Sequence, residues 1–125
     1  MKIFFDGGFR PATGMELAVV AGGRGHIERE LGPGSSMAAE WLALIAAIRL
    51  ALTLELTDVL LLGDAAAVIA QANGLVRVPP ACRDHFDVWT RIPRPPGRVR
   101  LRYVKRTQNL AGIALPRLRD GRTSE

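Results

Sequence analysis

Residues 2–8 read KIFFDGG: an apolar run, one aspartate and two glycines. The run of Ile3, Phe4 and Phe5 is typical of a buried strand. An ionised carboxylate beside it would lose hydration on burial, which costs free energy unless the charge is paired. Asp6, which we expect to end this strand, therefore needs a partner: a turn that it braces or a cation that it binds.

Length and composition indicate one globular domain. The chain has 125 residues, 48% of them hydrophobic, which is enough for one sizeable core and excludes intrinsic disorder. The single cysteine, Cys82, excludes an internal disulfide framework and a cysteine-based zinc site, and it fits a reducing cytoplasm. We expect the domain to span residues 1–118 and residues 119–125 to form a flexible tail.

Two features argue against a membrane location. The N-terminus lacks the charged, apolar and small-residue zones of a signal peptide. The apolar stretch at residues 42–62 is interrupted by Arg49, Glu55 and Asp58. We therefore expect a core helix followed by a core strand, with no membrane span.

The charge of the chain is basic and uneven. The net charge is +5 and the sequence pI is about 10.6. Between Arg94 and Arg122, nine Arg or Lys residues stand against one acid, Asp120. Such a field favours a polyanionic partner, nucleic acid before membrane, although many basic faces only keep a protein soluble.

The hydrophobic pattern predicts a mixed α/β fold. Three antiparallel strands joined by glycine-containing turns are expected at residues 2–6, 14–23 and 25–31. Ser35 or Ser36 then offers an N-cap for a long helix that includes Trp41 to Leu52. The later elements expected are strands at 58–64 and 98–104 and helices at 65–74, 78–92 and 109–118, the last interrupted or ended by Pro116. Because strands and helices alternate there, parallel pairing through crossovers is expected.

Three acids fall where the apolar pattern predicts burial. Asp6 and Asp64 each end an apolar strand, and Glu40 lies in the first turn of the long helix with apolar residues on its face. If the two strands are parallel neighbours, both aspartates emerge at one carboxyl edge, where ligands commonly bind in open α/β folds. Converging carboxylates repel unless a cation lies between them, and such oxygen ligands suit Mg²⁺ or Mn²⁺.

Each acid taken alone also has a purely structural explanation. Asp6 could brace a turn, Glu40 could favour the positive end of its helix, and Asp64 could cap the following helix. Taken together within a basic chain, the three acids favour the metal site.

Four segments, in this order, resemble the type 1 ribonucleases H. They are FFDGG (4–8), SSMAAEWLAL (35–44), LLLGDAAAVIAQANG (60–74) and VKRTQNLAGIAL (104–115). Each motif alone is weak, whereas the ordered set spans nearly the whole chain and is fairly specific. The resemblance implies a ribonuclease-H-like five-stranded mixed sheet, with three antiparallel strands plus two parallel strands, flanked by helices.

The same resemblance implies an activity and a catalytic set. The activity is endonucleolytic cleavage of the RNA strand of an RNA/DNA hybrid with two magnesium ions. By position, Asp6 would contact both ions, while Glu40 and Asp64 would help to hold the ion that activates water.

Contacts with the hybrid are implied in the same way. Gly7 and Gly8 would let the backbone approach a phosphate, because neither has a Cβ. Four residues fall where relatives contact minor-groove edges and RNA 2′ hydroxyls, although helix capping and termination explain them equally well: Ser35, Ser36, Gln71 and Asn73. Lys105 and Arg106, at the end of the last expected strand, could meet phosphates and make binding salt-dependent.

The chain departs from the family at its closing helix. The family has a fourth acid four residues after an Asn, and counting from Asn109 this position is Ile113, which cannot coordinate a hard cation. Loss of this ligand weakens the second metal most. Two hypotheses remain: a ribonuclease H with reduced activity, or a catalytically lapsed module that binds nucleic acid or a partner protein without turnover.

Overall fold

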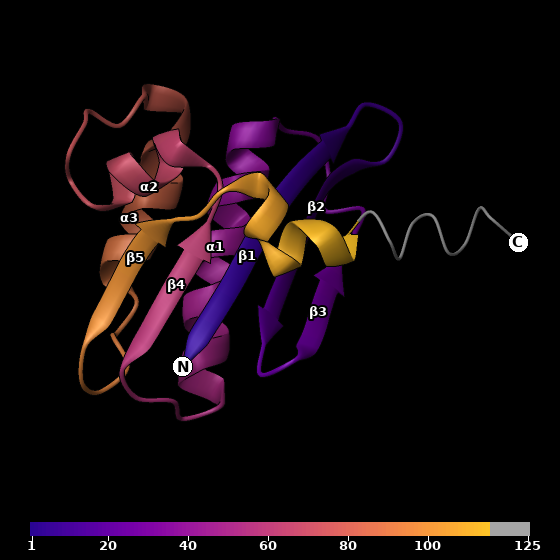
Figure 1. Ribbon diagram of the computed structural model, residues 1–125. Helices are drawn as coiled ribbons and strands as arrows, with labels where there is room; N and C mark the ends of the chain where they lie inside the picture. The colour runs from indigo at the N-terminus through magenta and orange to yellow at the C-terminus, as the bar shows by residue number, and fades with distance from the viewer. Residues whose placement is uncertain (116–125) are drawn as a thin grey trace, which may run out of the picture.

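The computed structural model describes residues 1–115 (Figure 1). Five strands form one sheet in the order β3-β2-β1-β4-β5. The strands are β1 (Lys2–Arg10), β2 (Gly14–Ala21), β3 (Arg24–Glu28), β4 (Val59–Gly63) and β5 (Val99–Tyr103). The first three pair antiparallel, β4 pairs parallel to β1, and β5 pairs parallel to β4. The predicted mixed sheet of three antiparallel and two parallel strands is confirmed.

Helices cover both faces of this sheet. The helices are α1 (Ser36–Thr53), α2 (Ala66–Ala72) and α3 (Arg83–Arg91), with short 3-10 turns at Pro80–Cys82 and Arg106–Gln108. Residues 110–115 are also helical and are called the last helix below. In Figure 1, α1 lies behind the sheet and the last helix lies in front of it. We call the side of the last helix the front face.

The main core lies between the sheet and α1. Its largest fully buried side chains include Ile3 and Phe5 of β1 and Trp41, Leu44 and Ile48 of α1. By length and composition α1 could span a membrane, yet its buried residues pack inside the fold. The helix α1 is therefore the core helix that the sequence predicted.

A second, smaller core forms under the last helix. Ala111 and Leu115 pack there against Ala18 and Val20 of β2. These contacts fix the last helix over the antiparallel part of the sheet.

Two strands end three or more residues away from the sequence expectation, and the other strand boundaries agree within two residues. β1 does not end at Asp6 but continues to Arg10, because residues 7–10 keep pairing with β2 after the pairing with β4 has stopped. β3 ends at Glu28 because Leu31 turns back and donates its backbone N–H to the carbonyl of Met15. The expected domain end at residue 118, the tail at 119–125 and the effect of Pro116 lie outside the described residues.

Candidate functional site

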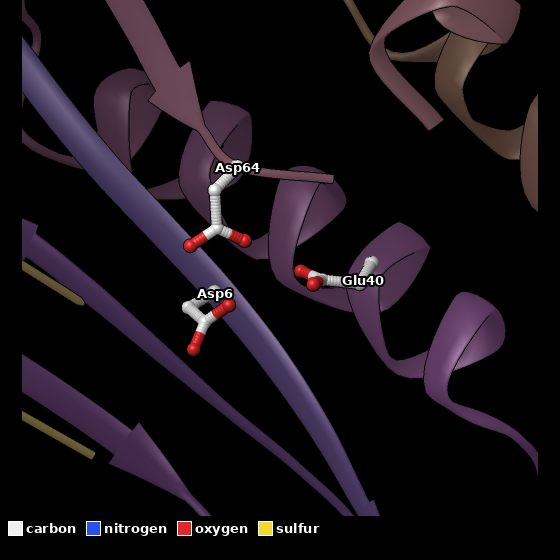
Figure 2. Close-up of side chains that lie close together, drawn as sticks. All are labelled: Asp6, Glu40 and Asp64. Carbon is white, nitrogen blue, oxygen red and sulfur yellow. The ribbon is translucent and has the colours of Figure 1, made fainter. Parts of the chain in front are cut away.

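The parallel pairing of β1 with β4 brings two acids together. Phe4 pairs with Leu62, and Asp6 and Asp64 each follow two residues later. Asp6, inside β1, and Asp64, just after β4, therefore lie close together where the pairing of β1 with β4 ends, as predicted from the strand order. Carboxylate oxygens of Asp6, Asp64 and Glu40 lie within 4.8 Å of one another. Figure 2 shows the three carboxyl groups turned toward a common point, from β1, the end of β4 and α1.

Gly7 explains how the helix residue reaches this point. A Cβ at position 7 would collide with the backbone carbonyl of Ala39, so glycine permits α1 to lie directly against β1. The backbone N–H of Gly7 then donates to Oε1 of Glu40 at 2.8 Å. Glu40, the fifth residue of α1, is thereby fixed beside Asp6. The resemblance implied that the missing Cβ of Gly7 lets a phosphate approach the backbone. In the structure α1 fills this space instead.

The electrostatics of the cluster show strain that a cation would relieve. Burial, and next the charge of Asp64, raise the pKa of Asp6 to about 6, against a smaller opposing effect of Arg106. Burial, and next the charge of Asp6, raise the pKa of Glu40 to about 8. Without a cation, burial and the repulsion between these carboxylates therefore favour the protonated form of Glu40 near neutral pH. Three clustered carboxylates are the donor set that a hard divalent cation requires, so these residues fit such an ion.

Asn109 locks the cluster from the other end of the chain. Its side chain is fully buried, and its Nδ2 donates to the carbonyl of Phe5 at 3.0 Å and to Oδ2 of Asp64 at 3.3 Å. Its Oδ1 accepts from the backbone N–H of Ala111 at 3.1 Å, which caps the last helix. One side chain thus ties β1, Asp64 and the last helix together. From the sequence, Asn109 served only to count to the position of the fourth acid. Its place at the start of the predicted last helix was the signal that could have identified it as a capping residue.

The last helix brings no acid to the cluster. A Cβ at Gly112 would lie 3.3 Å from Oδ2 of Asp6 and 3.8 Å from Oδ2 of Asp64, so this glycine faces the carboxylates most directly. Ile113, the expected fourth position, follows in the same turn and is 40% exposed. The residue of this helix that is shown to face the cluster is therefore a glycine.

Gln71, an expected hybrid contact, is buried with structural partners. It is only 3% exposed, its Oε1 accepts from Nε1 of Trp41 at 3.0 Å, and its Nε2 donates to Sδ of Met37 at 3.8 Å. In this structure the amide satisfies the indole of the core residue Trp41, so a structural role accounts for Gln71, and its contact with a hybrid stays a prediction.

Structural contacts also account for two other candidates. Ser35 is the N-cap of α1, with its Oγ accepting from the backbone N–H of Ala38 at 3.0 Å. Asn73 ends α2 and donates to the carbonyl of Leu101 at 3.1 Å. Both remain exposed and open to a ligand on their other side.

The remaining candidates lie at or near the surface. Ser36, Lys105 and Arg106 are exposed and Gly8 is partly exposed. Arg106 is close enough to lower the pKa of Asp6, which places its positive charge beside the cluster. Ser36, Lys105, Arg106 and Gly8 therefore stay available to a polyanion.

Comparison with known proteins agrees with this geometry. Residues 24–116 match the family described as reverse transcriptase-like. No curated protein sequence matches the chain.

Solved structures share the fold over most of the chain. The RNase H1 of the halophilic archaeon Halobacterium salinarum is 24% identical, with 91% of this chain and 92% of that one covered and a TM-score of 0.77. An N-terminal RNase H domain from Mycobacterium tuberculosis is 23% identical, with 91% and 93% covered and a TM-score of 0.75. LC11-RNase H1, isolated from compost and solved with an RNA/DNA hybrid, is 21% identical, with 86% and 87% covered and a TM-score of 0.65. The family match covers most of the sequence, and the chain therefore belongs to the reverse transcriptase-like family of ribonuclease-H-like proteins.

Proposed function

We propose that this protein is a ribonuclease H, an endonuclease that hydrolyses the RNA strand of RNA/DNA hybrids with Mg²⁺ or Mn²⁺. The observation that carries the proposal is the cluster of Asp6, Glu40 and Asp64, with carboxylate oxygens within 4.8 Å of one another. The similar fold of LC11-RNase H1, solved with an RNA/DNA hybrid, supports the choice of substrate. The free, buried Cys82 is consistent with a cytoplasmic enzyme.

The residues of the chain would divide the work as follows. Asp6, Glu40 and Asp64 would hold a divalent cation, which supplies Lewis-acid activation of a phosphodiester and of the attacking water. Asn109 fixes the position of Asp64 by its hydrogen bond, and Gly7 fixes Glu40 in the same way. Orientation of this kind lowers the barrier because the ligands need no rearrangement during the reaction.

The substrate would be positioned by exposed groups around the cluster. Lys105 and Arg106 would attract phosphates on one side. Ser35, Ser36 and Asn73 lie on the other elements that border the cluster, and their polar side chains can meet the 2′ hydroxyl that distinguishes RNA from DNA.

Cleavage of a labelled RNA/DNA hybrid tests the proposal. The purified protein is incubated with the hybrid, an RNA duplex and a DNA duplex of the same sequence, with Mg²⁺ or Mn²⁺ titrated in each. We expect cleavage confined to the RNA strand of the hybrid and abolished by EDTA. Absence of products with both metals at high enzyme concentration would rule the proposal out.

A binding module without turnover is the second candidate. It is favoured by one observation: within residues 110–115 the last helix presents Gly112 to the cluster and contains no acid. In the same assay this candidate predicts that the hybrid is bound, by anisotropy, and is left intact with either metal.

A further inference from the structure

The front face of the sheet is only half covered. The last helix packs against Ala18 and Val20 of β2. Over β4 and β5, no helix within residues 1–115 lies on the same side (Figure 1). This uncovered part of the front face is called the open half-face below.

The strand register defines what the open half-face presents. Side chains of paired residues point to the same side of a sheet. The first row pairs Lys2 with Leu60 and Leu60 with Arg100, and the second row pairs Phe4 with Leu62 and Leu62 with Arg102. Because Leu101 points into the main core, its neighbours Arg100 and Arg102 point to the front. The open half-face therefore has an apolar floor with cations at its borders.

These cations are exposed, and no acid within residues 1–115 forms an ion pair with them. Lys2, Arg100 and Arg102 are exposed, while Phe4 and Leu60 are partly exposed between them. The ion pair found within residues 1–115 joins Arg10 to Glu16, so none of the three cations touches a described carboxylate. Phe4 packs on one side against the core under the last helix, and Leu62 is buried, so Phe4 and Leu60 are the apolar side chains that the floor partly exposes. A partly exposed aromatic and apolar floor bordered by exposed cations suits unpaired bases and their phosphates.

The open half-face lies close to the carboxylate cluster. Asp6 follows Phe4 by two residues along β1, and Asp64 follows Leu62 by two residues at the end of β4. At about 3.3 Å per strand residue, the second row lies about 7 Å from the acids and the first row about twice as far. A strand that passes the cluster would reach the second row across residues 104–109, which connect β5 to the last helix at this edge (Figure 1).

We propose that the open half-face binds an unpaired strand, RNA or DNA, that continues from the hybrid beyond the cluster. Arg100 and Arg102 contact its phosphates, and Phe4 stacks against a base. This inference rests on the proposed function, because the hybrid at the cluster supplies the strand. Its consequence is a preference for hybrids with single-stranded ends or junctions over blunt hybrids.

Binding of four fluorescent probes in EDTA tests this surface. The probes are a blunt hybrid, the same hybrid with a six-nucleotide RNA extension, the same hybrid with a DNA extension, and the RNA extension alone. The variants are the pair Arg100→Gln with Arg102→Gln, and a control pair, Arg83→Gln with Arg91→Gln. The control removes the same charge from exposed positions of α3, which packs on the other side of the sheet.

We expect an extension to strengthen binding by the intact protein about tenfold over the blunt hybrid. The Arg100/Arg102 variant should lose this ratio, and its salt slope for the extended probe should fall by about 1.4, since each lost single-strand phosphate contact removes about 0.7. The control should keep the ratio. The RNA and DNA arms decide which strand is preferred.

Two results would overturn the inference. The first is equal binding of blunt and extended probes by the intact protein. Arg100 and Arg102 would then serve only to prevent another strand from pairing with the edge strand β5. The second is an equal loss of the binding ratio in the control variant, which would show that the ratio depends on net charge and not on the open half-face. Cleavage of the blunt hybrid with metal is measured separately, so failure of the proposed function is recognised independently of these ratios.

Discussion

The two sides of the carboxylate cluster are built very differently. The strand side comprises Asp6, Glu40 and Asp64 around β1 and β4. There the carboxylate of Glu40 accepts a hydrogen bond from the backbone of Gly7, and that of Asp64 accepts one from the fully buried Asn109.

The helix side is the last helix, where Gly112 and Ile113 offer neither a metal ligand nor a hydrogen bond from a side chain. The carboxylates that fit a cation are therefore held in place on one side of the cluster only, and under the proposed function a second cation would need ligands from the substrate.

Removing the central acid should have the largest effect. Asp6→Asn takes away a carboxylate that both sides of the cluster face, and loss of several kcal/mol of metal stabilisation lowers the cleavage rate at least about a thousandfold. The rate is measured on a labelled hybrid, with Asp84→Asn on the exposed start of α3 as the control. Residual activity near that of the unchanged protein would place the active centre elsewhere.

Removing the side chain of Asn109, which holds the strand side together, should lower the free energy of unfolding. Asn109→Ala leaves the carbonyl of Phe5 without this side-chain donor and uncaps the last helix, at about 3 kcal/mol of unfolding free energy. Urea denaturation measures the loss. Asn73→Ala, which removes one bond to the carbonyl of Leu101, should cost only about 1 kcal/mol. Equal costs at both positions would contradict the central place of Asn109.

Metal removal should make stability depend on pH. The folded-state pKa values of about 6 for Asp6 and 8 for Glu40 lie above their ordinary values of 3.8 and 4.5. Between roughly pH 4.5 and 8 the folded state therefore binds more protons than the unfolded chain, and the unfolding free energy falls as pH rises. In EDTA we expect Tm to fall by about 5 °C across this window.

Two controls assign that slope to the cluster. Glu40→Gln should flatten most of it, because the group with the higher pKa is gone, and excess Mg²⁺ should flatten it in the unchanged protein. A slope that survives both would come from groups outside the cluster.

Adding an acid to the helix side should have the smallest effect. Ile113→Asp supplies an oxygen ligand next to the cluster and should raise cleavage about fivefold at low Mn²⁺, a change of about 1 kcal/mol. Ile113→Asn is the matched control, since it adds polarity without charge. An unchanged rate for the acid would show that Gly112, which faces Asp6 at 3.3 Å, marks the true fourth position.

Local pattern was sufficient for most of the fold. The apolar runs around Ile3 and Leu61 predicted the parallel neighbours, and the helical spacing after Ser35 predicted α1. The acids followed from these elements, because the expected parallel strands and helix bring all three together, although each acid alone has a structural explanation. The extension of β1 to Arg10 was missed, since pairing with β2 continues through glycines that read as a turn.

Contacts between distant elements could not be predicted in this way. Gln71 reads as a polar residue near a helix end, and only the position of Trp41 in the folded chain shows that its amide is buried. Gly7 reads as a flexible residue, whereas its missing Cβ makes room for α1. In both cases the decisive partner is more than 29 positions away in the sequence.

The hydrogen bond from Asn109 to Phe5 joins residues 104 positions apart. During synthesis on a ribosome, residues 6, 40 and 64 leave the exit tunnel long before Asn109, whose hydrogen bonds hold the cluster in place. A nascent chain can therefore collapse around the first strands and α1 while its carboxylate cluster is still without Asn109, and such long-range closure is slow. The cluster reaches its described geometry only after residue 109 has been made and has returned to β1.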